Sequence, residues 1–218
     1  MGKLRLAVLI SGRGSNLQAL ITACAQADFP AEIALVISNK AAAPGLQLAT
    51  AAGIATRVFD HTAYASRSDF DRHITRAMEE IGTELVCLAG FMRLLSDEFC
   101  DHWRDRMINI HPSLLPAFKG LDVQQAALDA GVRFAGCTVH YVRKEMDTGP
   151  ILVQAVVPIG PDDTADSLAQ RILAEEHRIY PLAVRLIADG RVSIKDERAV
   201  ISGHEAPTGQ LINPPAGA

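Results

Sequence analysis

Residues 4–18 read LRLAVLISGRGSNLQ, and they decide the fold class of this chain. Leu4–Ile10 is an almost continuous apolar run, which is typical of a strand buried on both faces of a parallel sheet. A turn follows over residues 11–16, and residues 17–27 then carry apolar side chains at helical spacing. A strand, a glycine-containing turn and a helix in this order predict the opening of a βαβ unit.

The same alternation continues through the first half of the chain. The patterns predict further strands at 33–38, 55–59 and 85–89, and helices at 44–52 and 67–81. This cadence favours an α/β fold of the Rossmann-like kind, in which helices flank a mostly parallel, twisted sheet.

The second half has a different character. A short strand at 107–110 runs into a proline-rich loop, and a short helix is expected at 123–130. The β-rich segments 134–142 and 151–157 flank a loop at 143–150, which predicts an antiparallel strand pair in the C-terminal half. Thr164 opens a long helical pattern that we expect to be broken or kinked near Pro181 and to stop at Gly190.

Composition bounds the class of protein. The 218 residues are 49% hydrophobic and 21% charged with a formal net charge of −4, as is ordinary for a soluble globular protein. We therefore expect no basic surface for nucleic acid, and no apolar run reaches the ~20 residues of a membrane helix. Cys24, Cys87, Cys100 and Cys137 are scattered, which predicts reduced thiols and no metal site. We therefore expect a cytoplasmic location and no separate signal segment before the first strand.

The turn at 11–16 is the first candidate site. Its position between a strand and a helix brings free backbone N–H groups together with the positive end of a helix dipole, which favours a phosphate. No Gly-Lys-Ser/Thr follows, and Leu17 stands where a dinucleotide fingerprint needs Gly or Ala, so a monophosphate is the better prediction. The alternative is a plain turn in which Ser15 or Asn16 caps the helix.

The segment NIHPSLLP at 109–116 is the second candidate. Alternate residues of a strand share a face, so Asn109 and His111 are expected to point the same way. An amide donor beside an imidazole at the carboxyl end of a parallel strand is suited to stabilising an oxyanion. The alternative is a hydrogen-bonded polar pair that fixes the proline-rich loop.

The third candidate is Asp147, which precedes Thr-Gly-Pro. An aspartate in this setting often forms a turn and nothing more. The functional interpretation is that its carboxylate reaches a histidine and holds the ring in a useful protonation state. The sequence alone does not establish that Asp147 meets His111. His140, on the predicted strand 134–142, could support the same site, although a core or surface histidine is the usual interpretation.

Five segments in order resemble the phosphoribosylglycinamide formyltransferase family, and the likeness covers nearly the whole chain. They are the opening strand with its turn, LAGFMRLL at 88–95, NIHPSLLP at 109–116, GCTVHYV at 136–142 with MDTG at 146–149, and EHRIYP at 176–181. The resemblance implies that the formyl group of the co-substrate 10-formyltetrahydrofolate passes to the primary amine of glycinamide ribonucleotide. The products would be formylglycinamide ribonucleotide and tetrahydrofolate, in de novo purine synthesis.

The resemblance also assigns expected roles to single residues. The catalytic residues would be Asn109, His111 and Asp147, with no metal and no covalent intermediate. The substrate phosphate would lie on Gly14, Ser15 and Asn16, and the ribose on Glu176. The folate pocket would be lined by Arg67, Met92, Arg93, Leu94, Leu95 and Asn109.

The expected organisation is a single formyltransferase domain over 1–202. Its nucleotide-phosphate half would cover about 1–106 and its catalytic and folate half about 107–202, and 203–218, rich in Gly, Pro and Ala, is expected to be a loosely ordered tail. The expected partners are the two small molecules, without nucleic acid or membrane. The sequence leaves open the oligomeric state and the conformation of the loops at 117–126 and 143–150.

Two departures from the family and three rival functions remain. Residues 121–126 lack a histidine that many members carry, and Lys144 stands where an acidic or apolar residue is usual. A formyltetrahydrofolate hydrolase would use a similar site with water, but usually has an extra N-terminal domain, which we do not expect here because the first predicted strand starts at Leu4. A transfer-RNA formyltransferase would need a further C-terminal domain. A non-catalytic folate or nucleotide-binding protein would be favoured by loss of a catalytic residue, and all three are present.

Overall fold

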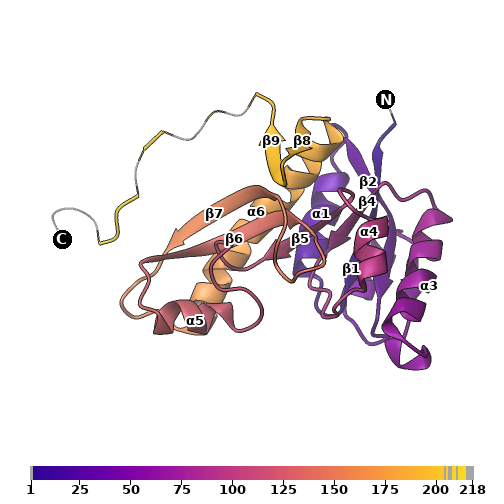
Figure 1. The fold of residues 1–218 in the computed structure, drawn as a ribbon, viewed down its shortest axis with the longest axis horizontal. Coiled ribbons are helices and arrows are strands. Elements are labelled where there is room, and N and C mark those ends of the chain that lie inside the picture. The colour runs from indigo at the N-terminus through magenta and orange to yellow at the C-terminus, as the bar shows by residue number, and fades with distance from the viewer. Residues whose placement is uncertain (1, 204, 206–207, 210, 215–218) are drawn as a thin grey trace.

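The computed structural model describes residues 2–203, 205, 208–209 and 211–214, and its centre is a seven-stranded sheet (Figure 1). The order of the strands is β3-β2-β1-β4-β5-β6-β7; β1 to β5 are parallel, whereas β6 and β7 pair antiparallel. The strands are β1 (Leu4–Ile10), β2 (Ala31–Ser38), β3 (Thr56–Val58), β4 (Leu85–Leu88), β5 (Met107–His111), β6 (Phe134–Tyr141) and β7 (Ile151–Pro158). The predicted fold class and the predicted antiparallel pair are therefore confirmed.

Helices cover both faces of the sheet. They are α1 (Ser15–Cys24), α2 (Gly45–Ala51), α3 (Arg67–Glu79), α4 (Asp97–His102), α5 (Val123–Asp129) and α6 (Ala165–Ala188), with a 3-10 turn η1 (His61–Ala63). Alternation along β1 separates the two cores: Leu6 and Val8 pack in a cluster with α1 and α6, whereas Ala7 and Leu9 pack in a cluster with α3 and α4. A strand buried on both faces explains why residues 4–10 are almost wholly apolar.

One short helix and one short hairpin were not predicted. Helix α4 has only six residues, most of them polar or charged, and it begins where the hydroxyl of Ser96 accepts a hydrogen bond from the amide of Phe99. The strands β8 (Val192–Lys195) and β9 (Arg198–Ile201) form a separate antiparallel hairpin after α6. Both elements are too short for a periodic pattern to be distinguished from a loop.

Of the two outcomes expected near Pro181, a break or a kink, the break is wrong, because α6 continues through this residue. The flanking side chains Tyr180, Ala183 and Val184 are fully buried against the sheet, and the hydroxyl of Tyr180 donates to the carbonyl of Leu88 at 2.9 Å. This packing offsets the ~3 kcal/mol that an internal proline costs a helix. The predicted stop at Gly190 is confirmed: its φ is 66°, as in a glycine-terminated helix.

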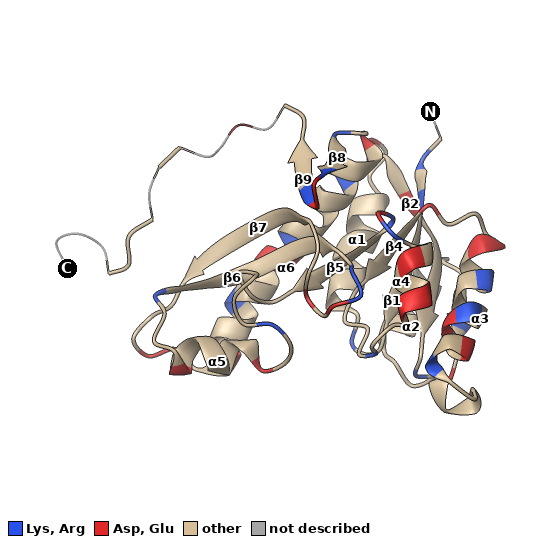
Figure 2. Cartoon of the chain, in the orientation of Figure 1, with Lys and Arg blue, Asp and Glu red and all other residues tan. Residues whose placement is uncertain are grey.

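The surface of the described part carries charges of both signs. Lys and Arg alternate with Asp and Glu along α3 (Figure 2). Within the described residues, no helix combines the length and the apolar character needed to cross a bilayer. The expected tail at 203–218 lies partly outside the described residues; of those that are described, Asn213 donates to the carbonyls of Arg133 and Ile159.

Candidate active site

The predicted site segments meet at the carboxyl edge of the parallel strands. The turn after β1 and the turn after β4 are joined through Ser11, whose amide donates to the carbonyl of Gly90 at 3.1 Å. The Ser11 hydroxyl accepts from the amide of Met92 at 2.8 Å and donates to the side chain of Asn39 at 2.6 Å. The segment expected to hold a phosphate and the segment expected to hold folate are therefore fixed side by side.

The N-terminus of α1 presents uncapped backbone amides. Gly14 occupies the N-cap position with φ 79°, and no side chain caps the helix there. This geometry differs from the alternative in which Ser15 or Asn16 serves as the cap. A Cβ on Gly14 would lie 2.8 Å from the Cα of Gly45, so both the dihedral angle and the contact require glycine. Free N–H groups at the start of a helix suit an anion.

Asn16 turns away from the helix cap and pairs with Glu176 on α6. Its amide nitrogen donates to Oε2 of Glu176 at 2.7 Å, and both residues are buried. Burial raises the pKa of Glu176, against the opposing effects of the Asn16 hydrogen bond and the nearby His111 ring. The carbonyl oxygen of the Asn16 side chain is buried and has no protein partner. The Asn16–Glu176 pair at the start of α1 therefore still has an acceptor oxygen for a further hydrogen bond.

The structure brings His111 and Asp147 together, although the sequence did not establish that they meet. Nδ1 of His111 lies 3.5 Å from Oδ1 of Asp147, and the two side chains are 6% and 10% exposed. The second ring nitrogen, Nε2, lies 2.9 Å from the carbonyl oxygen of Phe118, and the amide of Gly120 donates to Oδ2 of Asp147 at 2.8 Å. The loop after the proline-rich segment therefore contacts both side chains.

Asn109 is oriented by His140 across the sheet. The two residues are partners in the β5–β6 register, and Nδ2 of Asn109 lies 3.4 Å from Nε2 of His140. Nδ1 of His140 faces the carbonyls of Tyr141 and Thr148 at 2.9 and 3.1 Å, so this nitrogen carries the proton and Nε2 accepts from Asn109. Burial lowers the pKa of His140, which favours this neutral form. The contact leaves the second N–H of the Asn109 amide free for another acceptor.

Two residues that the sequence reasoning missed anchor the proline-rich segment. Thr138 lies opposite His111 in the β5–β6 register, and its hydroxyl donates to the carbonyl of Ser113 at 2.7 Å. The same hydroxyl accepts from the amide of Leu115, and Gln154 donates to the Leu115 carbonyl at 3.0 Å. Thr138 and Gln154 reach this segment because of the antiparallel register of β5, β6 and β7, and no sequence motif marks either residue.

The residues expected to bind folate form a rim beside this centre. Met92 and Leu94 are 66% and 60% exposed, although both are large and apolar. The guanidinium of Arg93 lies over the ring of Phe70, with 5.6 Å between the guanidinium carbon and the ring centre. Leu95 packs against the second core cluster, and Arg67 is the first residue of α3. An exposed apolar rim of this kind suits a flat hydrophobic ligand.

Buried Asp71 connects α3 to this rim. Its carboxylate accepts from the amide of Ser96 at 2.7 Å. Burial raises the pKa of Asp71, whereas the Ser96 hydrogen bond and the charges of Arg67 and Arg93 oppose that rise. The hydrogen bond to Asp71 therefore fixes the end of the turn at 90–96 to α3.

The arrangement is suited to acyl transfer between two bound molecules. An amide donor and an imidazole lie on β5 with a carboxylate against the imidazole, and the anion-binding turn and the apolar rim follow the neighbouring parallel strands β1 and β4. Ser113 donates its hydroxyl to the carbonyl of Ala117 at 2.7 Å, so this hydroxyl is not paired with a histidine as an activated nucleophile would be. Among the described residues, no three His, Cys, Asp or Glu side chains gather as a metal site would require.

Comparisons with known proteins point in the same direction. The family model described as "Formyl transferase" matches residues 4–184. The chain is 50% identical over 192 residues to the trifunctional purine biosynthetic protein adenosine-3 of Gallus gallus, covering 88% of this chain and 19% of that protein. The chain thus spans about a fifth of the length of that relative. It is 42% identical to the phosphoribosylglycinamide formyltransferase of Escherichia coli, with 94% of this chain and 96% of that protein covered.

Solved structures give the same picture. A glycinamide ribonucleotide transformylase 1 from Symbiobacterium toebii is 49% identical with a TM-score of 0.89, and the match covers 91% of this chain and 94% of that one. A formyltetrahydrofolate deformylase from Burkholderia mallei has a TM-score of 0.84 at 28% identity, and the match covers 92% of this chain but 70% of that one. The shared architecture therefore extends to a hydrolase, while the sequence is nearer to the transferases.

Proposed function

Because the chain belongs to the formyl transferase family, we propose that it transfers the formyl group of 10-formyltetrahydrofolate to the primary amine of glycinamide ribonucleotide. The products are formylglycinamide ribonucleotide and tetrahydrofolate, in the cytoplasmic synthesis of purines. The observation that supports the proposal is the contact of Asp147 with His111 at the end of β5, the strand that also carries Asn109. A nucleophile anchored by a phosphate at that helix start would reach an acyl group held over the catalytic side chains.

The nucleotide is proposed to lie along α1 and α6. Its phosphate binds the backbone at Gly14, Ser15 and Asn16, where helix N–H groups lack side-chain partners. Its ribose hydroxyls bind Glu176, whose carboxylate is already oriented by Asn16. The phosphate end and the amine end of the substrate are then fixed by different elements, which orients the amine toward β5.

The folate is proposed to occupy the rim formed by the turn after β4. Its flat ring lies against Met92, Leu94 and Leu95, with Arg67 and Arg93 at the edge, and Asn109 contacts the reacting end of the molecule. The exposed apolar side chains at this rim support the assignment, because binding a ring there removes them from water.

The chemistry follows from the positions of the three catalytic side chains. The neutral amine attacks the formyl carbon, a C–N bond forms, and the formyl oxygen becomes an oxyanion. The free N–H of Asn109 and an N–H of His111 donate to that oxygen. The carboxylate of Asp147 holds His111 and accepts the proton of the amine, directly or through water. The bond from carbon to the folate nitrogen then breaks, and the proton passes to that nitrogen, so no group stays on the enzyme.

Two contacts must change before this step. Nε2 of His111 is occupied by the carbonyl of Phe118, and Oδ2 of Asp147 by the amide of Gly120. Substrate entry therefore requires the loop at 117–122 to move, after which the substrates replace those two backbone partners.

We propose that residues 1–202 act as one formyltransferase domain. The nucleotide-phosphate half, about 1–106, contributes β1 to β4, and the catalytic and folate half, about 107–202, contributes β5 to β7. The folate rim at Arg67 and 92–95 belongs to the first half in sequence, so the two halves share the site. The proposed partners are small molecules only.

A steady-state assay with 10-formyltetrahydrofolate, run with and without glycinamide ribonucleotide, tests the function. We expect tetrahydrofolate to form only when the nucleotide is present, in equal amount to formylated nucleotide. Tetrahydrofolate that forms without the nucleotide would identify a hydrolase, the alternative favoured by the likeness to a deformylase. Binding of both ligands with no product would identify a non-catalytic binding protein.

A further inference from the structure

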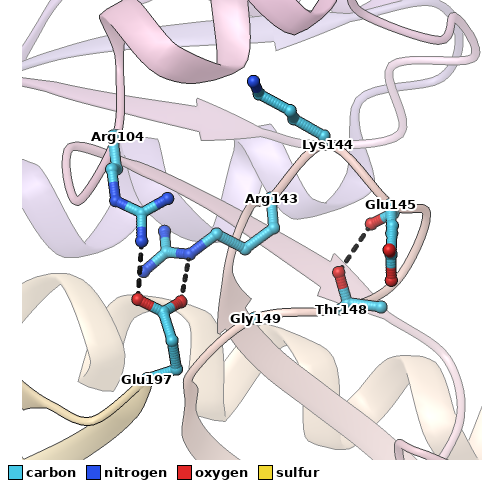
Figure 3. A pocket seen from close by; sticks show the side chains of 7 residues that line it. All are labelled: Arg104, Arg143, Lys144, Glu145, Thr148, Gly149 and Glu197. Atoms are coloured by element: carbon cyan, nitrogen blue, oxygen red, sulfur yellow. Dashed lines mark hydrogen bonds and ion pairs between the residues drawn. The ribbon is translucent and has the colours of Figure 1, made fainter.

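An open pocket of about 400 Å³ is lined in part by residues of the loop between β6 and β7, which also carries Asp147 (Figure 3). It is lined by Arg104, Arg143, Lys144, Glu145, Thr148, Gly149 and Glu197. None of these residues has a role in the proposed reaction. The lining residues come from three separate segments: the turn before β5, the loop between β6 and β7, and the turn between β8 and β9.

Arg143 is the centre of this cluster. Its Nε donates to Oε2 of Glu197 at 2.6 Å, its Nη2 donates to Oδ1 of Asp105 at 2.7 Å, and its Nη1 donates to the carbonyl of Val142 at 3.1 Å. The side chain is only 11% exposed, although it belongs to a loop. A guanidinium with all three nitrogens engaged has one available orientation, unlike a typical surface arginine.

Glu197 reaches Arg143 from the tip of the β8–β9 hairpin. The two tip residues, Asp196 and Glu197, have φ of 48° and 56°, as in the turns that best fit a two-residue hairpin. The other oxygen of Glu197 accepts from Nη2 of Arg104 at 2.6 Å. Figure 3 shows one oxygen of the carboxylate joined to Arg104 and the other to Arg143. The hairpin therefore presents one carboxylate to two arginines.

The aliphatic part of the Arg143 side chain packs against Gly149, near the other end of the loop between β6 and β7. A Cβ on Gly149 would lie 2.9 Å from Cγ of Arg143 and 2.2 Å from the carbonyl oxygen of Tyr141. The loop thus closes tightly on itself between Arg143 and Gly149, with Asp147 inside the closed stretch at φ 51°. Gly149 lies two residues from Asp147, so we expect a shift of Arg143 to reach the backbone that carries this carboxylate.

The pocket is poorly suited to bind an anion. Arg104 and Arg143 face Glu197, Arg143 also faces Asp105, and Lys144 pairs with Asp101 at 2.7 Å. Each cation of the lining is already paired with a carboxylate. A role in holding the loop accounts for these contacts, whereas a role in binding a ligand leaves them unexplained.

We propose that Arg143, held by Glu197 and Asp105, is a positioning residue that sets the carboxylate of Asp147 against His111. The hairpin β8–β9 then contributes to catalysis without touching a substrate. We call Arg143 with its partners Glu197 and Asp105 the clamp. The inference rests on the proposed function, because it assigns to this clamp the placement of a catalytic group. A displacement of about 1 Å in such a group can lower the rate up to ~10²-fold.

The test uses three variants of the full chain and one matched control. Arg143→Met keeps the apolar stem that packs on Gly149 and removes the guanidinium. Glu197→Ala removes its half-exposed partner, and the double variant measures their coupling. Arg104→Met is the control, since Arg104 pairs with the same carboxylate but does not belong to the loop. The readouts are kcat, the KM for glycinamide ribonucleotide, and amide hydrogen exchange over 143–150.

We expect Arg143→Met to lower kcat about tenfold and Glu197→Ala about threefold, with the KM for the nucleotide within twofold of the unmodified protein. The double variant should be no slower than Arg143→Met alone. Exchange over 143–150 should increase in these variants and stay unchanged in Arg104→Met.

Two results would overturn the clamp. The first is unchanged exchange and unchanged kcat in Arg143→Met. The second is an equal loss in Arg104→Met, which would indicate a general effect of surface charge. Hydrogen exchange needs no substrate, so a protein that fails to transfer formyl would refute the proposed function while the clamp is still measured.

Discussion

The carboxylate of Asp147 lies 3.5 Å from Nδ1 of His111, and the backbone of Phe118 and Gly120 closes over the pair. His111 is the last residue of β5, and Asp147 lies in the loop between β6 and β7. Both ring nitrogens of His111 face an oxygen, so the ring has one orientation rather than two. This fixed orientation is the physical basis of the role proposed for the pair.

The first prediction concerns Asn109 as an oxyanion donor. Asn109→Ala should lower kcat ~10²–10³-fold, as is typical when one such donor is removed. The KM for both substrates should change less than threefold, because the contact forms mainly in the transition state. Steady-state kinetics measure both quantities. A rise in KM with unchanged kcat would assign Asn109 to ground-state binding instead.

A second prediction follows from the lowered pKa of His140. Its folded pKa lies below the ordinary 6.5, so the fold favours the neutral ring. The stability from His140 is complete above about pH 6.5, and it is lost as the pH falls from there through the folded pKa. Thermal unfolding between about pH 5 and 8 should show that His140→Asn loses less stability on acidification than the unmodified protein. If the two proteins lose the same stability on acidification, the protonation of His140 is not the cause of the acid sensitivity.

Glu176 provides a third prediction, because burial raises its pKa. A carboxyl with a raised folded pKa destabilises the fold once the pH has passed through that value, since it must then be ionised while buried. The Tm of Glu176→Gln relative to the unmodified protein should therefore rise between about pH 4 and 7. Nucleotide affinity should fall about tenfold with the loss of a charged acceptor. A Tm of Glu176→Gln that falls or stays constant relative to the unmodified protein over this pH range would contradict the sign.

The fourth prediction tests the turn at the start of α1. Gly14→Ala places a Cβ at φ 79° and 2.8 Å from the Cα of Gly45, so it should destabilise the protein by about 1–3 kcal/mol. Gly12→Ala is the matched control, because a Cβ there meets no atom within 4 Å, and its stability should change by less than about 0.5 kcal/mol. Denaturant unfolding measures both. Equal stability of the two variants would refute the steric requirement.

The sequence was sufficient where local chemistry determines the structure. The apolar run at Leu4–Ile10, the glycine turn after it and the stop at Gly190 follow from burial and dihedral preference, and each element lies where it was expected. The parallel order of β1, β4 and β5 then brings the ends of these strands to one edge. The approximate neighbourhood of the candidate site could be predicted for this reason.

Contacts set by tertiary packing could not be predicted. The pairing of Asn109 with His140 depends on the β5–β6 register, which no single strand encodes. Arg143 and Glu197 are both ordinary surface residues by type, and only the hairpin brings them together. Pro181 was misjudged because the burial of its neighbours outweighs the cost of one lost helix hydrogen bond.

The most direct test of the account is the turnover of Asp147→Asn, measured with the binding of glycinamide ribonucleotide to the same sample. An asparagine keeps the size of the side chain but loses the charge that faces His111, so kcat should fall at least ~10²-fold. The Kd for the nucleotide should stay within about threefold, because the phosphate site on α1 is separate. Turnover close to that of the unmodified protein would contradict the role of the Asp147–His111 pair.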